Sequence, residues 1–274
     1  MTVRQSLKKI MPAPIWGLGS DVYWGWRNRG RHRLAQMYDG RWSASVKKLT
    51  QLENIHTGQR CFIIGNGPSL RQTDMSRLKG EVTFGLNRIY LMFPELGFST
   101  SYLVLVNDLV IEQCAREIEQ LIVPKFITWR ARAWLHPDPN LTYLDTDFTG
   151  EEGFSTCLTR RIYEGFTVTN VALQLAFYMG FSEVILIGVD HNYITQGTAN
   201  QAIVSEGDDP NHFAANYFGK GFKWQLPDLA GSERGFIRAR EAYAKAGRRI
   251  VDATIGGKLT IFPKVDYPSL FQAS

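Results

Sequence analysis

The sequence predicts an α/β protein with a Rossmann-like fold, in which helices cover both faces of a mainly parallel sheet. Beyond residue 58, short apolar segments alternate with segments of helical spacing, as in a chain of strand–helix–strand units. The first apolar segment runs directly into a Gly-Asn-Gly-Pro turn at residues 65–68, which suits a ligand-binding turn at a strand end. A chain of 274 residues can hold one large domain with an appendage.

Six segments are expected to form buried strands, because each is short, apolar and followed by polar or turn-forming residues. They are residues 61–64, 82–86, 102–106, 125–128, 184–187 and 249–252.

Three segments have the spacing of helices: residues 109–122, 169–179 and 232–246. Gly180 and Gly247 follow the second and third, where a helix C-terminus favours glycine. Ser232 is a candidate N-cap for the third helix. Residues 191–231 are polar, rich in aromatic residues and without clear periodicity, so we expect a lid there.

Positive charge is concentrated at the N-terminus. Residues 1–57 contain ten Lys or Arg and three Asp or Glu. Residues 58–274 contain 21 Lys or Arg and 23 Asp or Glu. Several aromatic residues lie among the arginines of the N-terminal segment, including Trp16, Tyr23, Trp24, Trp26 and Trp42. We therefore expect a basic helical arm at 1–57, which binds an anionic membrane surface, and a catalytic domain at 58–274.

The alternative is an arm whose tryptophans pack on its own domain or on a second subunit of a homo-oligomer. Nucleic acid is not the expected partner. No run of about 18 apolar residues predicts a membrane span, and the N-terminus lacks the apolar core of a signal peptide. Cys61, Cys114 and Cys157 are odd in number and widely separated in the sequence. We therefore expect them to be reduced thiols. We expect a cytoplasmic protein, peripheral on the cytoplasmic face of the membrane if the arm binds lipid.

The turn after the first strand combines residue types that suit a nucleotide. Gly65 and Gly67 permit positive φ and remove side-chain bulk, so that a phosphate or ribose can approach backbone amides. Asn66 can both donate and accept hydrogen bonds, and Pro68 fixes the exit of the turn. The pattern is neither G-x-G-x-x-G nor G-x-x-x-x-G-K-[ST]. An ordinary strand-to-helix turn is the alternative.

Polar residues also follow other predicted strands. Ligands of open parallel sheets bind outside the carboxyl ends of the strands, so these residues should converge on one site. The candidate nucleotide-binding residues are Gly65, Asn66, Gly67, Pro68, Ser69, Asn87, Arg88, Asn107, Asp108, Gly188 and Asp190. Taken singly, each Asn or Asp also fits a turn former.

Several motifs resemble known families. Gly-Asn-Gly-Pro-Ser-Leu at 65–70, Phe-Gly-Leu-Asn at 84–87 and Asn107 resemble the nucleotide-binding half of the small bacterial sialyltransferases that use CMP-sialic acid. Residues 167–170 and 178–190 resemble the acceptor-side helix and following strand of that family. Residues 211–213, 217–221, 256–259 and 262–263 resemble more closely the 6-hydroxymethylpterin diphosphokinase-like group, which includes motility-associated glycosyltransferases. The resemblance covers roughly residues 58–265.

The sialyltransferase resemblance implies metal-independent, inverting transfer of an acidic sugar from a CMP-sugar to a glycan acceptor, with no required cofactor. Asn66, Asn87 and Asn107 match positions that hold the nucleotide in that family. Thr167, Thr169 and Asn170 begin a predicted helix, and its N-terminal amides would bind the carboxylate of the sugar.

Such a transfer needs a base for the acceptor hydroxyl and hydrogen-bond donors for the departing phosphate. His212 and His191 are the candidate bases, because imidazole titrates near neutral pH. Tyr193, Tyr217 and Lys220 are the candidate donors. A loop histidine that only makes a structural hydrogen bond is the alternative.

Two other functions stay open. Mg²⁺-dependent diphosphate transfer from ATP to 6-hydroxymethylpterin would use carboxylates at strand ends, where Asp108, Asp190 and Asp252 stand. A non-catalytic nucleotide-binding scaffold would keep the fold without a base. Asn216 supports that alternative, because it stands where the sialyltransferase resemblance places the catalytic histidine.

Overall fold

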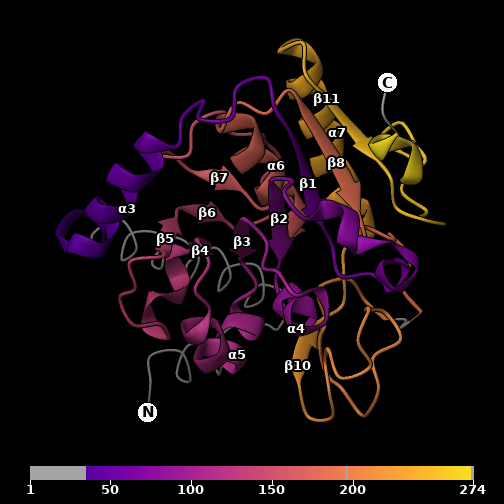
Figure 1. Ribbon diagram of the computed structural model, residues 1–274. Coiled ribbons are helices and arrows are strands. Elements are labelled where there is room, and N and C mark those ends of the chain that lie inside the picture. The colour runs from indigo at the N-terminus through magenta and orange to yellow at the C-terminus, as the bar shows by residue number, and fades with distance from the viewer. Residues whose placement is uncertain (1–34, 195–196, 273–274) are drawn as a thin grey trace, which may run out of the picture. The chain divides into compact units, whose positions relative to one another are not determined.

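The computed structural model describes residues 35–194 and 197–272 of the chain. The chain divides into two compact units, residues 1–43 and 44–274, and the second contains the sheet (Figure 1). Most of the arm expected at residues 1–57 lies outside the described residues, and its membrane role stays a prediction.

A seven-stranded parallel sheet forms the centre of the second unit. Its order is β11-β8-β1-β2-β3-β4-β5, with β1 between β8 and β2. The strands are β1 (Arg60–Ile64), β2 (Thr83–Leu86), β3 (Tyr102–Leu105), β4 (Lys125–Thr128), β5 (Leu141–Leu144), β8 (Glu183–Ile187) and β11 (Arg249–Asp252). Every residue of β2, β4 and β5 is buried, so both faces of the sheet are covered.

All six predicted strands are present, and the Rossmann-like α/β fold is confirmed. Strand β5 was not expected, because its four residues follow a proline-containing loop and lack a continuous apolar run. Two short pairs lie outside the sheet: parallel β6 (Thr146–Asp147) with β7 (Ile162–Tyr163), and antiparallel β9 (Ala202–Val204) with β10 (Lys223–Gln225). The second pair lies in the segment expected to form a lid, beyond the ends to which the sheet arrows point in Figure 1.

Besides helical residues at 35–38, the described part of the chain contains five bounded α-helices. They are α3 (Gly40–Gln51), α4 (Phe93–Leu96), α5 (Asp108–Gln120), α6 (Val168–Tyr178) and α7 (Leu229–Lys245). The predicted helices correspond to α5, α6 and α7, but α7 starts three residues early. Its N-cap is Asp228, whose carboxylate accepts from the Gly231 N–H at 2.7 Å. Ser232 is not the cap, because its hydroxyl donates back to the Leu229 carbonyl.

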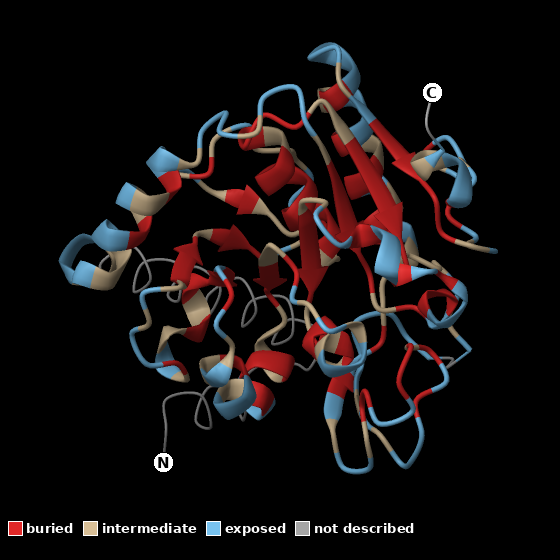
Figure 2. Ribbon diagram, viewed as in Figure 1, coloured by how far each residue is buried: buried red, intermediate tan, exposed pale blue. Residues whose placement is uncertain are grey.

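Helix α6 packs across β1, β2 and β3 and against α7. Nine of its eleven residues are buried, as expected for a helix that is apolar on nearly all sides. The strands and α6 form the continuous buried core that is red in Figure 2. Because α6 is fixed in this core, its N-terminus has a defined position at the carboxyl end of the sheet.

Candidate functional site

A cavity of about 800 Å³ lies at the carboxyl ends of the strands, bounded by the N-terminus of α6 and by residues of the β9–β10 region. It brings together most of the residues that the sequence predicted for the site. Those that line it are Gly65, Asn66, Gly67, Asn87, Asn107, Asp108, Thr167, Thr169, Gly188, Asp190, His191, Tyr193 and His212.

The glycines of the first turn are required for close approach and not for positive φ. Gly67 has a φ of −68°, and Gly65 is likewise outside the left-handed region. A Cβ on Gly65 would overlap the Gly188 carbonyl oxygen, and one on Gly67 would overlap the carboxylate of Asp190. This carboxylate accepts from the Ser69 N–H at 3.0 Å and from the Ser69 hydroxyl at 2.6 Å. The turn after β1 is thus tied to the loop after β8, and neither glycine uses the positive φ that the sequence suggested.

Two asparagines at strand ends have unsatisfied amide oxygens. Oδ1 of Asn66 and Oδ1 of Asn87 are both buried and have no hydrogen-bond partner. Asn87 also has a positive φ of 45°. Of the five described non-glycine residues with positive φ, four line the cavity: Asn87, Phe166, His191 and Asn200. Such backbone conformations are concentrated at functional sites, where surrounding contacts enforce them.

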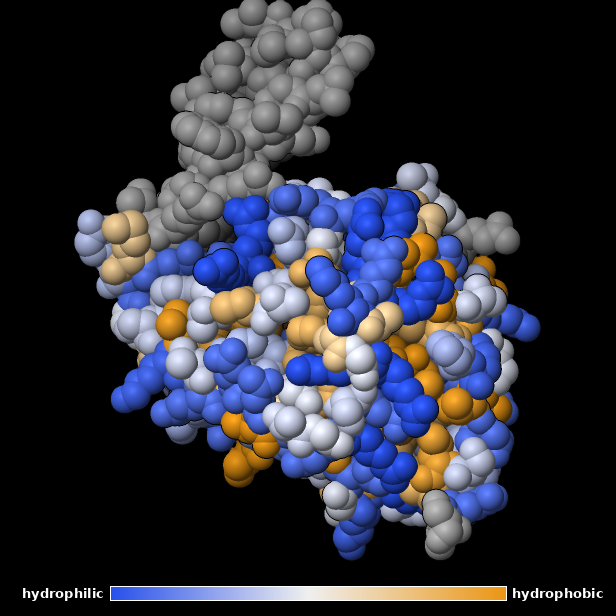
Figure 3. All heavy atoms as spheres, turned by 90° about the horizontal axis from the view of Figure 1, so that it is seen from above, coloured by the Kyte–Doolittle hydropathy of each residue, from blue (hydrophilic) through white to orange (hydrophobic). Residues whose placement is uncertain are grey.

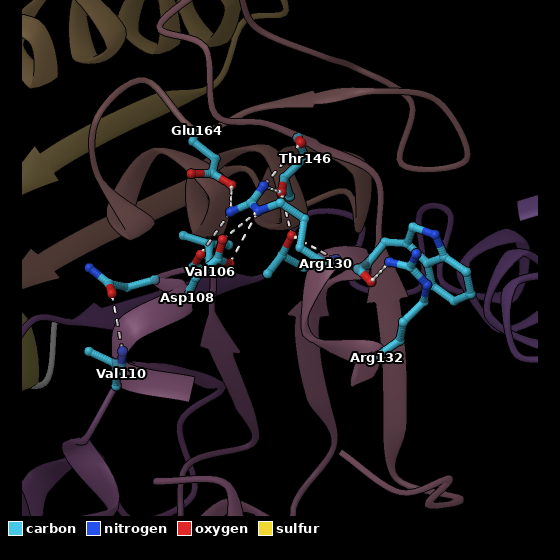
Figure 4. Close-up of polar contacts among 10 residues, drawn as sticks. Val106, Asp108, Val110, Arg130, Arg132, Thr146 and Glu164 are labelled. Atoms are coloured by element: carbon cyan, nitrogen blue, oxygen red, sulfur yellow. Dashed lines mark hydrogen bonds and ion pairs between the residues drawn. The ribbon is translucent and has the colours of Figure 1, made fainter. Parts of the chain in front are cut away.

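Arg130 occupies the centre of an ion-pair network on one wall of the cavity (Figure 4). Its Nε donates to the carboxylate of Asp108 at 2.9 Å, and one terminal nitrogen pairs with Glu164 at 2.9 Å. The terminal nitrogens also donate to Thr146 Oγ1 and to the Val106 carbonyl. Burial raises the pKa of Glu164, and Arg130 opposes that shift. Arg130 was not predicted from the sequence, although it stands two residues after a correctly predicted strand.

Asn107 caps α5, because its Oδ1 accepts from the Val110 N–H at 3.2 Å (Figure 4). Thr167 similarly caps α6 through the Thr169 N–H at 3.3 Å. Tyr193 lines the cavity, and burial raises the pKa of its hydroxyl to about 12. At neutral pH that hydroxyl is therefore protonated and can donate a hydrogen bond.

Both predicted histidines line the cavity, and each pairs with a carboxylate. His212 Nδ1 lies 2.7 Å from Asp209 Oδ2, and His191 Nε2 lies 2.9 Å from Glu233 Oε1. Asp209 was not predicted; its one sequence signal is the three-residue spacing to His212. Asn216, which suggested the loss of a base, is exposed and absent from the cavity lining.

Six predicted site residues do not line the cavity: Pro68, Ser69, Arg88, Asn170, Tyr217 and Lys220. Pro68 begins the 3₁₀ turn Pro68–Gln72, and Lys220 is exposed. Arg88 is 7% exposed and binds the Tyr217 carbonyl, while the Arg88 N–H donates to the Tyr217 hydroxyl at 3.3 Å. Asn170 is fully buried and donates to the Tyr163 carbonyl. The buried side chains of Arg88, Asn170 and Tyr217 lie behind the cavity lining.

The three carboxylates considered for Mg²⁺ do not all line the cavity. Asp252 is fully buried, pairs with Lys264 at 2.6 Å and does not line the cavity. Asp108 and Asp190 line it, and each already accepts hydrogen bonds from the protein. In the described part of the chain, no three His, Cys, Asp or Glu residues are arranged to hold a metal ion.

Residues 35–196, more than half of the chain, match the family described as 6-hydroxymethylpterin diphosphokinase MptE-like. The chain belongs to this MptE-like family. The resemblance expected from the sequence is thereby confirmed for this group, whereas the relation to sialyltransferases stays a prediction. The matched segment includes the glycine turn, Arg130 and His191 but ends before Asp209 and His212.

Among solved structures, the MptE-like chain is similar to the MAf glycosyltransferase from Magnetospirillum magneticum AMB-1. The TM-score is 0.50 at 16% sequence identity, over 79% of this chain and 35% of that chain. This likeness concerns the fold, and this chain spans about a third of the length of that protein. A search of curated proteins finds no match.

In the described residues, no helix has the length and apolar character needed to cross a membrane. The face drawn in Figure 3 is mostly hydrophilic, with apolar side chains visible between the polar ones.

Proposed function

We propose that this MptE-like protein is a glycosyltransferase that moves an acidic sugar, such as a sialic acid-like sugar, from a CMP-sugar to a surface-glycan acceptor. The observation that carries the proposal is the pair of buried, unsatisfied amide oxygens of Asn66 and Asn87 in the cavity wall. Supporting observations are the family membership and the fold shared with the MAf glycosyltransferase.

The two unsatisfied oxygens specify the chemistry of the missing partner. A buried acceptor without a donor costs about 1–3 kcal/mol, so a ligand that donates to it gains affinity. Ribose hydroxyls donate and accept, and can therefore satisfy an amide group in either orientation, whereas a phosphate oxygen at neutral pH mainly accepts. We therefore assign the ribose, or the amino group of the base, to Asn66 and Asn87. The phosphate then lies toward the Tyr193 hydroxyl, because the Gly65 and Gly67 N–H groups already donate to the Ile187 and Gly188 carbonyls.

The N-terminus of α6 supplies the expected place for the sugar carboxylate. Thr167 and Thr169 line the cavity, and helix α6 is eleven residues long. The Thr169 N–H is already capped by Thr167, so the support for an anion here comes from the dipole of the helix, which is positive at its N-terminus. In the transfer, a base removes the proton of the acceptor hydroxyl, the oxygen bonds to the anomeric carbon, and the bond from that carbon to the CMP phosphate oxygen breaks.

Thermal unfolding in the presence of nucleotides tests this proposal. CMP, CDP, UDP, GDP and ATP would each be added with and without Mg²⁺. A ligand at 100 times its Kd should stabilise the protein by about 2.7 kcal/mol. Stabilisation by CMP without Mg²⁺ is the expected result. If no nucleotide stabilises the protein, nucleotide binding is refuted, and with it the glycosyltransferase, the diphosphokinase and the nucleotide-binding scaffold.

The excess of acidic residues in the cavity lining favours a second candidate function. This function is Mg²⁺-dependent transfer of diphosphate from ATP to 6-hydroxymethylpterin. Among the described lining residues, Arg130 is the one Lys or Arg, whereas five carboxylates contribute: Asp108, Asp147, Glu164, Asp190 and Asp228. Such a lining suits a nucleotide whose phosphates bring their own Mg²⁺. Stabilisation by ATP that requires Mg²⁺, with none by CMP, would select this function.

A further inference from the structure

We infer that Asp209 is a positioning residue that holds His212 as the base of the site, with Nε2 of the imidazole facing the substrate. The inference rests on the proposed glycosyl transfer for its role, although its geometry can be tested without any substrate. It also decides between the two histidines that line the cavity.

The carboxylate of Asp209 is buried and fixed from several directions. Its side chain is 3% exposed, and Oδ2 lies 2.7 Å from His212 Nδ1. The other oxygen accepts from the Asn211 N–H at 2.9 Å, and the Asp209 N–H donates to the Ala215 carbonyl at 2.8 Å. An ionised carboxylate can only accept, so Nδ1 must carry the proton in this pair. The lone pair of a neutral imidazole is then on Nε2.

Aromatic packing fixes the plane of the His212 ring. The ring stacks on Tyr217 with a centroid distance of 4.0 Å and an interplanar angle of 5°. Phe218 contacts it edge-on at 4.9 Å. His212 lines the cavity, and no described residue forms a hydrogen bond with its Nε2. The stack explains why Tyr217 is buried behind the wall: it orients the imidazole instead of contacting phosphate.

The backbone places this histidine beside the nucleotide turn. The Phe213 N–H, one residue after His212, donates to the Asn66 carbonyl at 2.9 Å, and Arg71 Nε donates to the Phe213 carbonyl at 2.7 Å. The segment with the base is therefore bonded directly to the turn with the unsatisfied amide. A substrate that reaches Asn66 lies close to His212.

His191 has a different environment. Its Nε2 is engaged by Glu233, which belongs to α7 and whose side chain is 45% exposed. Water solvates that carboxylate, so it constrains the imidazole less than buried Asp209 does. His191 also has a positive φ of 52°, which the pairing with α7 helps to hold. We assign His191 to the structure of the strand-end loop.

In the proposed reaction, His212 Nε2 takes the proton of the acceptor hydroxyl as the oxygen bonds to the anomeric carbon. CMP leaves with the electron pair of the broken bond. The imidazolium formed is stabilised by Asp209, which keeps its negative charge throughout.

Nitrogen-15 NMR of the histidine side chains in the full chain tests the tautomer directly. His212 signals are assigned by their loss in His212→Gln. Neutral His212 should have its proton on Nδ1 in the wild type. In Asp209→Asn, the new amide can donate to Nδ1, and the proton should move to Nε2. The matched control, Glu233→Gln, should leave the His212 tautomer unchanged. A wild-type His212 protonated on Nε2, or an unchanged tautomer in Asp209→Asn, would overturn the inference.

A second measurement separates this inference from the proposed function. CMP release from CMP-N-acetylneuraminate, with water as acceptor, should fall on the order of 10²-fold or more in Asp209→Asn, with nucleotide affinity unchanged. Equal release by both proteins would refute the role of Asp209. Absence of release by the wild type would count against this donor and the proposed function, and the NMR result would still decide the His212–Asp209 geometry.

Discussion

Replacing Arg130 with Met tests whether its ion pairs hold one wall of the cavity together. The Arg130 side chain is 12% exposed, while those of Glu164 and Asp108 are 15% and 41% exposed. Removing one partner of a buried ion pair lowers the free energy of unfolding by about 3–5 kcal/mol, because a charge remains buried and unpaired. Water can solvate Asp108, so the loss of its partner adds little to the destabilisation. Glu164 is more deeply buried and accounts for most of it. With one poorly solvated charge left, we expect a loss near the low end, about 3 kcal/mol.

The loss should depend on pH, because burial already raises the pKa of Glu164 with Arg130 in place. Without Arg130 this pKa should rise further. A carboxyl group whose folded pKa exceeds its unfolded value of about 4.3 binds protons on folding, so stability falls as pH rises through that interval. The destabilisation in Arg130→Met should accordingly be larger at about pH 8 than at about pH 5. Adding Glu164→Gln should restore part of the stability at the higher pH.

Urea unfolding at both pH values, followed by circular dichroism, measures these differences. Arg132→Met is the matched control from the same turn, where the guanidinium lies 4.7 Å from the Trp129 ring and donates to the Trp129 carbonyl (Figure 4). The control should lose about 1 kcal/mol or less. Equal losses in the two variants, or a loss in Arg130→Met that grows as pH falls, would show that the buried charges are not the cause.

Other predictions concern the nucleotide turn and the arm. Asn66→Ala should weaken nucleotide binding roughly tenfold, about 1.4 kcal/mol by titration calorimetry, with little change in stability; unchanged affinity would remove Asn66 from the site. Gly67→Ala should lower the free energy of unfolding by about 1–3 kcal/mol, because its Cβ overlaps the Asp190 carboxylate. Gly207→Ala, with open space around the added carbon, should change stability little, and similar losses in both would contradict the steric argument. Removal of residues 1–34 should abolish sedimentation with anionic vesicles; retained binding would assign membrane contact to another part of the chain.

Much of the fold could be predicted from local patterns. Buried parallel strands are short and apolar whatever their partners, so six of the seven sheet strands were predictable from composition. Strand β5 escaped because Thr142 and Tyr143 interrupt the apolar run by which the other strands were recognised, although both residues are common in strands and the segment pairs with β4. The start of α7 was misplaced because Ser232 and Asp228 are both good caps in sequence, and hydrogen-bond geometry alone distinguishes them.

The candidate site was predictable where residues directly follow strands, because parallel strands bring their carboxyl ends to one edge. Asn66, Asn87 and His191 were found in this way. Arg130 was not, because its importance depends on Asp108, Thr146 and Glu164, which approach it only through pairing of several elements.

The sequence by itself thus determined the strands, the main helices and the polar turn that ends β1, because these depend on periodicity and turn chemistry over a few residues. The tertiary structure decided which side chains face the cavity. Tyr217 supports the wall and His212 lines it, although both belong to one predicted lid. It also decided that Gly65 and Gly67 are needed for contact with the β8 loop. The physical reason is that burial, charge pairing and close approach arise between residues distant in sequence, so no local pattern records them.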